Sequence, residues 1–310
     1  MPKHRTTRPM CAPSRYRGAA CTVVAVDARD RFAALFEASP IVLFDGAVCI
    51  AECAAVAVTM SRTEAGRVFD RAGVERAVDR LASGVDAPIL ASVIEHLCER
   101  EGFAGDTDRY DDPRNSFVDR VLERRRGIPI TLSVLAIEVG RRAGATLLPI
   151  GMPGHFLIGE ACRGGEVSGD QVNGLGEVGE VGEFGDVFHG EVLDTDACAA
   201  LYSRLFGARR RLAPADLEPT PVPAVLARML NNLEAGPLGH DLDALGWMLD
   251  LHCLIPDLSL ADRVALANRL ELLGRFDDAA TQLERAGHHL GDDLGARIRA
   301  RAAVCRSRRN

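Results

Sequence analysis

The sequence predicts an α+β fold, in which a helical bundle with a small antiparallel sheet is followed by an α-helical tail. Three observations carry this prediction. From Ile130 to Val139 seven of ten residues are apolar, a run too long for an ordinary strand and typical of a helix buried nearly all round. Short apolar segments separated by turns follow this helix. Beyond the proline-rich residues 214–223 the pattern is helical throughout.

The composition is that of an ordinary globular protein. The 310 residues carry a net charge of −7 and are 47% hydrophobic, enough for a core and consistent with two structural units. No run approaches the roughly 18 apolar residues of a membrane helix, so no membrane span or membrane partner is expected. The first 20 residues are basic and lack the apolar region of a secretory signal, which predicts a disordered basic tail over residues 1–27 or a start codon assigned too early, and a cytoplasmic protein.

The nine cysteines predict reduced, buried thiols. They include no Cys-x-x-Cys pair of the metal or redox type. Cys49 and Cys53 stand four residues apart on one helical face, but no histidine is near them in the sequence, so core packing is the better interpretation. We expect neither a metal nor another cofactor.

Helices are predicted for most of the first hundred residues, from apolar spacing and from capping residues. These are Asp30–Ala38, a helix opened by Ser39-Pro40 and reaching Ala57, one marked by Val74, Val78 and Leu81, and one from Pro88 to Leu97. The polar, turn-rich residues 102–116 predict a loop. We expect Asn115 and Ser116 to cap the next helix, Phe117–Arg126, which ends in three arginines. Because the chain is acidic overall, this basic run does not indicate nucleic-acid binding.

The central helix, 130–142, is predicted to begin at Pro129, where a missing N–H costs nothing, and to end at Gly144. Arg141 and Arg142 suit the carbonyls of its last turn. Three strands are then predicted, at Leu147–Ile150, His155–Ile158 and Val187–Leu193. A helix that Asp194 caps follows them and runs toward Phe206.

Two segments interrupt this pattern. Residues 163–185 are rich in glycine, valine and glutamate, which predicts an acidic surface insertion in a hairpin. The prolines near 214–223 exclude a helix interior and predict a linker over 211–223. Helices alone are predicted for 224–307. There, Leu273–Ala280 places a glycine, an aromatic residue and alanines where two antiparallel helices meet closely, a pattern that resembles a tetratricopeptide hairpin.

Three blocks of sequence together resemble the SirB-type branch of the transglutaminase-like proteins. They are Gly102-Phe103-x-Gly105 with Tyr110-x-x-Pro113-x-Asn115-Ser116-Phe117, then Arg126-Gly-Ile-Pro-Ile-Thr-Leu-Ser133, and Pro153-Gly-His-Phe156. The resemblance implies a papain/transglutaminase-like domain over residues 28–210, with a tetratricopeptide-like region over 224–307.

The resemblance also implies a catalytic triad, with a cysteine at the start of the central helix, a histidine on the next strand and an aspartate on the following one. A thiolate there is stabilised by the helix dipole and by the protonated imidazole, and the carboxylate fixes the imidazole tautomer. His155 and Asp186 match the last two positions. The nucleophile does not match, because Gly127-Ile128-Pro129 places a proline where the thiol belongs, and proline cannot attack an acyl group.

Two interpretations of the nucleophile stay open. Ser133 or Thr131, on the same helix, could supply a hydroxyl to His155, or both hydroxyls could bond carbonyl oxygens one turn back. His155 beside Asp186 is in turn either functional or structural. We expect the His155 and Asp186 side chains to lie within hydrogen-bond reach of one another.

The favoured function is a non-catalytic binding or regulatory role with a protein or peptide partner. An amide hydrolase or acyltransferase is the alternative. The candidate binding residues are Asn115, Pro129, His155, Asp186 and His189, of which His189 is either a second residue of the site or a turn residue.

Overall fold

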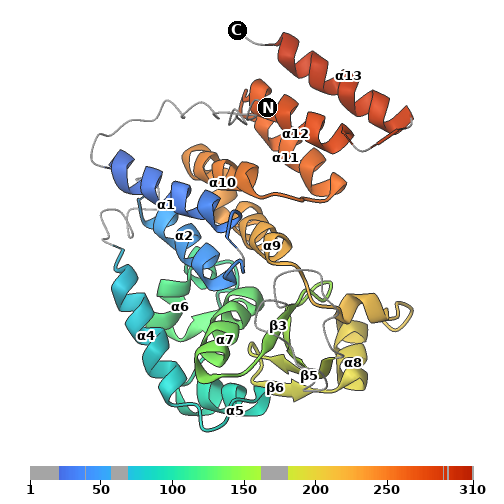
Figure 1. Ribbon diagram of the computed structural model, residues 1–310. Coiled ribbons are helices and arrows are strands. Elements are labelled where there is room, and N and C mark those ends of the chain that lie inside the picture. Colours follow the sequence, from blue (N-terminus) through green and yellow to red (C-terminus); the bar gives the residue numbers. More distant parts are fainter. Residues whose placement is uncertain are drawn as a thin grey trace, which may run out of the picture. The chain divides into compact units, whose positions relative to one another are not determined.

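The computed structural model describes residues 21–38, 40–56, 69–161, 181–288, 290–291 and 293–308 (Figure 1). The chain divides into two units, Val24–Leu258 and Met1–Val23 with Ser259–Asn310. The α-helices are α1 (Cys21–Leu35), α2 (Leu43–Val56), α4 (Arg71–Ser83), α5 (Leu90–Ile94), α6 (Val118–Arg124), α7 (Pro129–Ala143), α8 (Thr195–Phe206), α9 (Val222–Ala235), α10 (Leu242–Leu254), α11 (Leu260–Leu272), α12 (Phe276–Gly287) and α13 (Asp293–Ser307). The strands are β1 (Ala104–Gly105), β2 (Arg126–Gly127), β3 (Leu147–Ile150), β4 (Leu157–Ala161), β5 (Val181–Asp186) and β6 (Glu191–Leu193).

Strands β3 to β6 form an antiparallel sheet whose spatial order follows the chain. Helices α5 and α7 pack against one face, where Gly185 approaches Leu90 and Ile94. Helix α8 covers the other face (Figure 1). The core on that face consists of Ile150, Met152, Leu157, Phe184, Cys198, Leu201, Tyr202 and Leu217. Alternate residues of β3 and of the first part of β4 therefore serve two apolar layers, which explains why these residues are apolar.

The central helix α7 has the bounds that the sequence predicts. Pro129 is its first residue, and Gly144 ends it with φ of 91°, a left-handed conformation that favours glycine. Its two arginines do more than complement the helix dipole. Buried Glu138 accepts from Arg141 (2.8 Å) and Arg142 (2.7 Å), and Arg142 also pairs with acidic residues of α4. The end of α7 is thereby fixed to α4.

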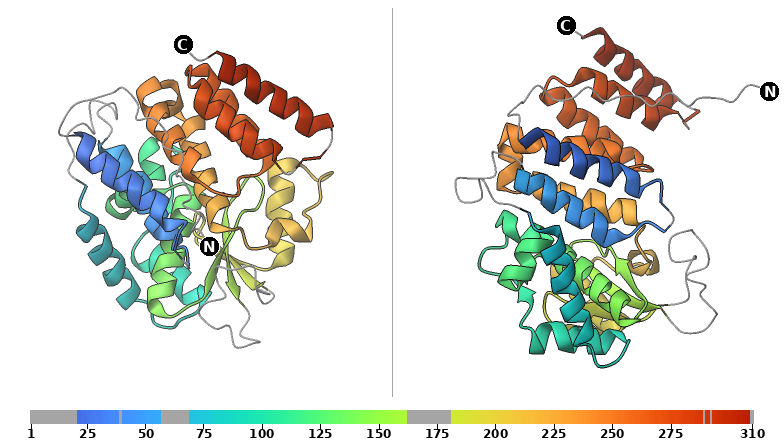
Figure 2. Two further views of the ribbon diagram at one scale, coloured as in Figure 1. Left: turned by 45° about the horizontal axis from the view of Figure 1, so that its top comes forward. Right: turned by 60° about the vertical axis from the view of Figure 1, so that its left-hand side comes forward.

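The remaining helices of this unit pack above α7. Helix α2 contacts α6, α7 and α9, and Gly46 on α2 leaves room for the Leu226 side chain of α9. Helices α1 and α2 lie side by side, as Figure 2 shows, and are joined by an ion pair of Arg31 with Glu52 (2.5 Å). Since Glu52 is buried, this pair satisfies a carboxylate that the core would otherwise exclude.

Several predicted helix starts need correction. Helix α1 begins at Cys21 rather than Asp30, so residues 21–27 are helical and not part of a disordered tail; residues 1–20 lie outside the described chain. Helix α2 begins at Leu43 rather than Pro40, and Ser39 is also outside the described residues. The helix expected from Pro88 begins at Leu90. A proline disfavours the helical conformation in the residue before it. Here the backbone is still extended at Ile89, the residue after Pro88.

The expected third strand, Val187–Leu193, is in fact a turn followed by a shorter strand. Residues 187–190 form the turn, and Asp186 ends β5 instead of opening the next strand. Residues 181–185, assigned to the acidic insertion, form most of β5, while residues 162–180 lie outside the described chain. The turn is stabilised by the Asp186 side chain, which sequence alternation alone could not reveal.

The proline-rich segment is attached to the sheet. Pro214–Leu217 form a 3-10 helix, and Pro219 pairs with Ile150 of β3 in an antiparallel bridge. The Thr220 N–H donates to the Pro149 carbonyl (2.8 Å) and its hydroxyl accepts from the Gly151 N–H (2.8 Å). Proline is tolerated here because this is a sheet edge. Helices α9 and α10, placed by sequence in a region starting at residue 224, group with the Val24–Leu258 unit.

The second unit contains α11 to α13, in which α12 contacts both neighbours. Gly274 between α11 and α12 has φ of 70°, and Ala279 and Ala280 are fully buried. Arg263 and Gln282 form a buried hydrogen bond of 3.0 Å. Small residues thus allow close helix packing at the predicted place. Among the described residues, no helix is long and apolar enough to cross a membrane.

Replacing Leu132 by alanine tests the burial of α7. Leu132 is 0% exposed, and removing its side chain should lower the free energy of unfolding by about 3 kcal/mol through lost burial and a residual cavity. The control Leu242→Ala removes a side chain that is 68% exposed and should change it by less than about 0.5 kcal/mol. Urea denaturation measures both, and equal effects would contradict the described core.

Candidate functional site

His155 lies in the turn that leads into β4 and is held there through its backbone. Gly154 before it has φ of 73°, which favours glycine, and the His155 N–H donates to the Met152 carbonyl (3.1 Å). From α9, Arg228 donates to the carbonyl oxygens of Met152 (3.3 Å) and His155 (2.8 Å). The imidazole is therefore positioned by main-chain contacts before the strand begins.

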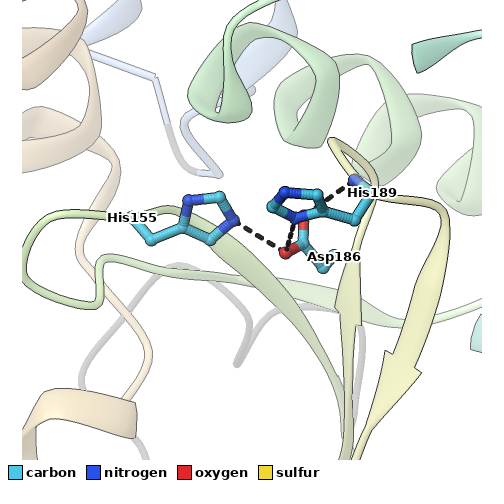
Figure 3. Close-up of side chains that lie close together, drawn as sticks. All are labelled: His155, Asp186 and His189. Atoms are coloured by element: carbon cyan, nitrogen blue, oxygen red, sulfur yellow. Dashed lines mark hydrogen bonds and ion pairs between the residues drawn. The ribbon is translucent and has the colours of Figure 1, made fainter. Parts of the chain in front are cut away.

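Asp186, at the end of β5, has a side chain that is only 1% exposed. Its Oδ2 lies 2.8 Å from Nε2 of His155 and 2.7 Å from Nδ1 of His189. Its Oδ1 accepts the backbone N–H groups of Phe188 (3.0 Å) and His189 (3.2 Å). Figure 3 shows both imidazoles turned toward this carboxylate. The expected contact between His155 and Asp186 is confirmed.

The hydrogen bonds determine the charge of Asp186. Burial works to raise the pKa of this carboxyl, but the hydrogen bonds and positive potential of His155 and then His189 outweigh it, and the pKa lies below its ordinary value. The carboxylate is therefore ionised at neutral pH. An ionised, buried carboxylate with four donors is a fixed acceptor that orients both imidazole rings.

Phe188 closes one side of the site. Its ring contacts those of His155 and Tyr110 edge-on, at centroid distances of 6.1 and 6.2 Å. Gly105 permits this placement, since a Cβ there would lie 2.4 Å from the Phe188 ring, and its N–H donates to the Phe188 carbonyl (2.9 Å). His189, in contrast, keeps 46% of its side chain exposed. The site thus has a packed side and a solvent side.

Asn115 does not cap α6, so that prediction is wrong. It instead stabilises the loop that precedes α6 and contacts the start of the central helix. It is fully buried, and its Nδ2 donates to the Arg109 carbonyl (2.7 Å) while its Oδ1 accepts from Arg124 (2.8 Å). Arg124 also pairs with Asp106 (3.0 Å), and the Asn115 carbonyl accepts the Ile128 N–H (3.3 Å). The extended Phe117 takes the N-cap position of α6 without a side-chain bond. Asn115 therefore supports the start of α7, outside the His155 cluster.

The start of α7 offers no nucleophile in contact with His155. Pro129 is the first helical residue, and the hydroxyls of Thr131 and Ser133 are fully buried. Neither hydroxyl has a hydrogen-bond partner among the described residues. Neither of the two interpretations left open by the sequence is therefore met, because the hydroxyls bond neither carbonyl oxygens one turn back nor His155.

The cysteines near Asp186 are not activated. Burial, with the nearby Asp186 charge, raises the pKa of Cys98 to about 11, and burial with the charges of Asp194 and Asp186 does the same for Cys198. A catalytic cysteine requires the opposite shift, because the thiolate is the attacking species. Both thiols remain protonated at neutral pH.

A pocket of about 150 Å³ lies beside this site, between the Tyr110–Ser116 loop and the end of α9. Tyr110 borders the pocket and also contacts Phe188, so it connects the pocket with the ring cluster. The histidines and Asp186 are not among its lining residues. Its lining comprises Tyr110, Asp111, Asp112, Pro113, Ser116, Ile128, Asn232, Leu233, Ala235, Gly236 and Pro237.

The structure thus brings His155, Asp186 and His189 together and leaves Asn115 and the α7 hydroxyls outside their hydrogen bonds. His189 serves both as a turn residue and as a member of the cluster. Sequence reasoning missed Phe188 and Arg228. Phe188 had a signal, since it lies two residues after Asp186, which matches the family's triad pattern, whereas one arginine on a helix has none.

A family model described as the transglutaminase-like superfamily matches residues 70–231. This range includes α4 to β6 and most of α9, and so contains every residue of the His155 cluster. No solved structure matches the chain.

Curated relatives match parts of the chain. A UPF0162 protein of Xylella fastidiosa (strain 9a5c) is 35% identical over 149 residues, which are 47% of this chain and 48% of that protein. UPF0162 protein PA3419 of Pseudomonas aeruginosa is 28% identical over 216 residues, 62% of this chain and 70% of that protein. Human F-box only protein 21 is 39% identical over 82 residues, 26% of this chain and 13% of that protein. The chain spans about half the length of the first of these relatives.

Replacing Asn115 by alanine should destabilise the protein by about 2 kcal/mol, because it leaves the Arg109 carbonyl and the Arg124 guanidinium with unmade hydrogen bonds. Asn232→Ala, on the exposed face of α9, is the matched control and should cost less than about 0.5 kcal/mol. Urea denaturation compares the two, and a neutral Asn115→Ala would show that the network does not support the loop.

Proposed function

The chain belongs to the transglutaminase-like superfamily, and on that premise we propose that it is a binding or regulatory protein and not an acyl-transfer enzyme. We assign it to the SirB-type branch that its three sequence blocks resemble. The proposal rests chiefly on Pro129, the first residue of α7, which stands where the triad pattern requires a cysteine. The site keeps an ordered imidazole and carboxylate but has proline in the nucleophile's place.

The other nucleophilic groups nearby support the same conclusion. A hydroxyl becomes a nucleophile when a base within hydrogen-bond reach takes its proton. Thr131 and Ser133 are buried and make no bond to His155. The thiols of Cys98 and Cys198 have raised pKa values, so they are weak nucleophiles at neutral pH.

A polar group of a bound segment fits the site that remains. Nε2 of His155 is committed to Asp186, which leaves Nδ1 of the same ring to bond a ligand atom. The first turn of α7 adds backbone N–H groups that have no acceptor within the helix. A carbonyl oxygen, from a peptide bond or from a side chain, can accept hydrogen bonds from Nδ1 of His155 and from these N–H groups.

The neighbouring pocket favours a protein or peptide partner over a free small molecule. Its volume of about 150 Å³ is below the roughly 300–1,000 Å³ of pockets that enclose drug-sized ligands. It accommodates one side chain, and half-exposed Tyr110 connects it with Phe188 beside His155. A segment bound at His155 could place one side chain in this pocket.

The C-terminal helices fit a role in binding. We propose that α11 to α13 are a short tetratricopeptide-like array, supported by the Gly274 turn and by the buried Ala279 and Ala280 between helices. Such arrays present helical surfaces to protein partners.

An amide hydrolase or acyltransferase is the second candidate. It is favoured by one observation, the 2.8 Å contact of His155 with Asp186, because a carboxylate-oriented imidazole is also what a general base requires. It would need Ser133 or Thr131 to turn toward His155.

The two candidates differ in covalent chemistry. We expect a fluorophosphonate probe to leave Ser133 and Thr131 unlabelled, as measured by peptide mass spectrometry. We also expect the wild type and His155→Ala to release the chromophoric leaving group of aryl esters and amides equally slowly. A serine hydrolase is the positive control for both assays. A label on either hydroxyl, or a turnover dependent on His155, would establish the enzyme instead.

Binding is tested with the full chain as bait in an extract of its native host. His155→Ala should reduce recovery of a specifically retained protein at least tenfold relative to the wild type. His240→Ala changes an exposed histidine outside the cluster and should leave recovery unchanged. Equal recovery with all three baits would contradict a binding role for the His155 site.

A further inference from the structure

We propose that His155, Asp186 and His189 form a binding site for one divalent transition-metal ion of the Zn²⁺ class. Nε2 of His155, Oδ2 of Asp186 and Nδ1 of His189 all lie within 4.8 Å of one another. Two imidazoles and one carboxylate are a ligand set used for zinc and related ions. The sequence predicted no metal, because it has no Cys-x-x-Cys pair and no histidine near Cys49 and Cys53. Only the fold brings His155 to Asp186 and His189.

The ligand atoms are at hydrogen-bond distances, slightly closer together than around a bound ion. Bonds of about 2.0–2.1 Å from a metal to nitrogen or oxygen place neighbouring ligand atoms about 2.9 Å apart at right angles and about 3.4 Å apart in a tetrahedron. The Asp186 oxygen lies 2.8 and 2.7 Å from the two ring nitrogens. Small outward movements of the rings, whose centroids are 5.7 Å apart, would admit the ion.

The surroundings hold the ligands as metal sites usually do. The other Asp186 oxygen, Oδ1, accepts two backbone N–H groups and is held by them. Among the described residues, Oδ2 bonds only the two ring nitrogens, and an ion bound at this site takes the place of the protons in those two hydrogen bonds. Arg228 fixes the main chain of His155, and Phe188 packs against its ring. Two of the three ligands therefore have little freedom, so binding an ion costs the protein little side-chain conformational entropy.

The third ligand gives access. His189 is on the turn after β5 and its side chain is 46% exposed, so an ion can enter from that side. Three protein ligands leave at least one coordination position open, which suits an oxygen or nitrogen atom of another molecule. The proposal goes beyond the binding role proposed above and does not rest on it, because the ion can be titrated with no partner present.

The test uses the full chain after treatment with a chelator. Zn²⁺ is titrated in competition with a chromogenic chelator, and Co²⁺ is followed by its visible absorption. We expect one ion per chain, bound at least tenfold more weakly by His189→Ala, Asp186→Asn and His155→Ala. His240→Ala, an exposed histidine outside the cluster, should bind as the wild type does.

Three results would overturn the proposal. These are the absence of stoichiometric binding, binding unchanged in the His189 variant, and a Co²⁺ spectrum with thiolate absorption, which would assign the ion to cysteines. His189→Ala decides the matter even if the variants of the buried residues do not fold, because its side chain lies on an exposed turn. Circular dichroism of each variant verifies its fold.

Discussion

The candidate site depends on the burial of one carboxylate. A charge removed from water is tolerated only when hydrogen bonds replace its hydration. Asp186 meets this requirement with four donors, two from imidazoles and two from the main chain of the following turn. The carboxylate thereby connects the end of β5, the turn that leads to β6, and the separate segment that carries His155. Loss of its charge would release all three.

The parts of the fold that sequence reasoning found are those with local signals. The bounds of α7 follow from Pro129, an apolar run and Gly144, and the Asp194 cap of α8 is confirmed by its bond to the Ala197 N–H. The pairing of His155 with Asp186 was also predictable, because a family pattern assigned both residues to neighbouring strands.

What sequence reasoning missed depends on particular hydrogen bonds that the residue pattern does not reveal. The alternating pattern around Val187 predicts a strand, but the Asp186 carboxylate binds the N–H groups there and stabilises a turn. Asn115 carries a capping signal, yet its amide bonds the Arg109 carbonyl and Arg124 across the loop. Proline density near Pro219 suggests a linker, whereas the segment pairs with the edge of β3. In each case a hydrogen bond outweighs the structure that the residue pattern suggests.

In the proposed function, the arrangement separates two properties that a triad normally combines. The orienting half, an imidazole fixed by a carboxylate, remains, while the nucleophile's position is proline. A site of this kind can bind polar groups without breaking covalent bonds. With His189 as a third possible metal ligand, it also has the proposed capacity to bind a metal ion, which a triad does not have. The account therefore relies on the identity of one residue at the start of α7, and on that position facing His155.

The most direct measurement replaces Pro129 by cysteine and follows alkylation of that thiol by iodoacetamide with peptide mass spectrometry. The account predicts rapid modification with an apparent pKa well below the roughly 8.5 of a free thiol, because the helix start and His155 stabilise the thiolate. His155→Ala in the same background should slow it at least tenfold at neutral pH. Slow alkylation that does not depend on His155 would show that Pro129 does not occupy the nucleophile's position.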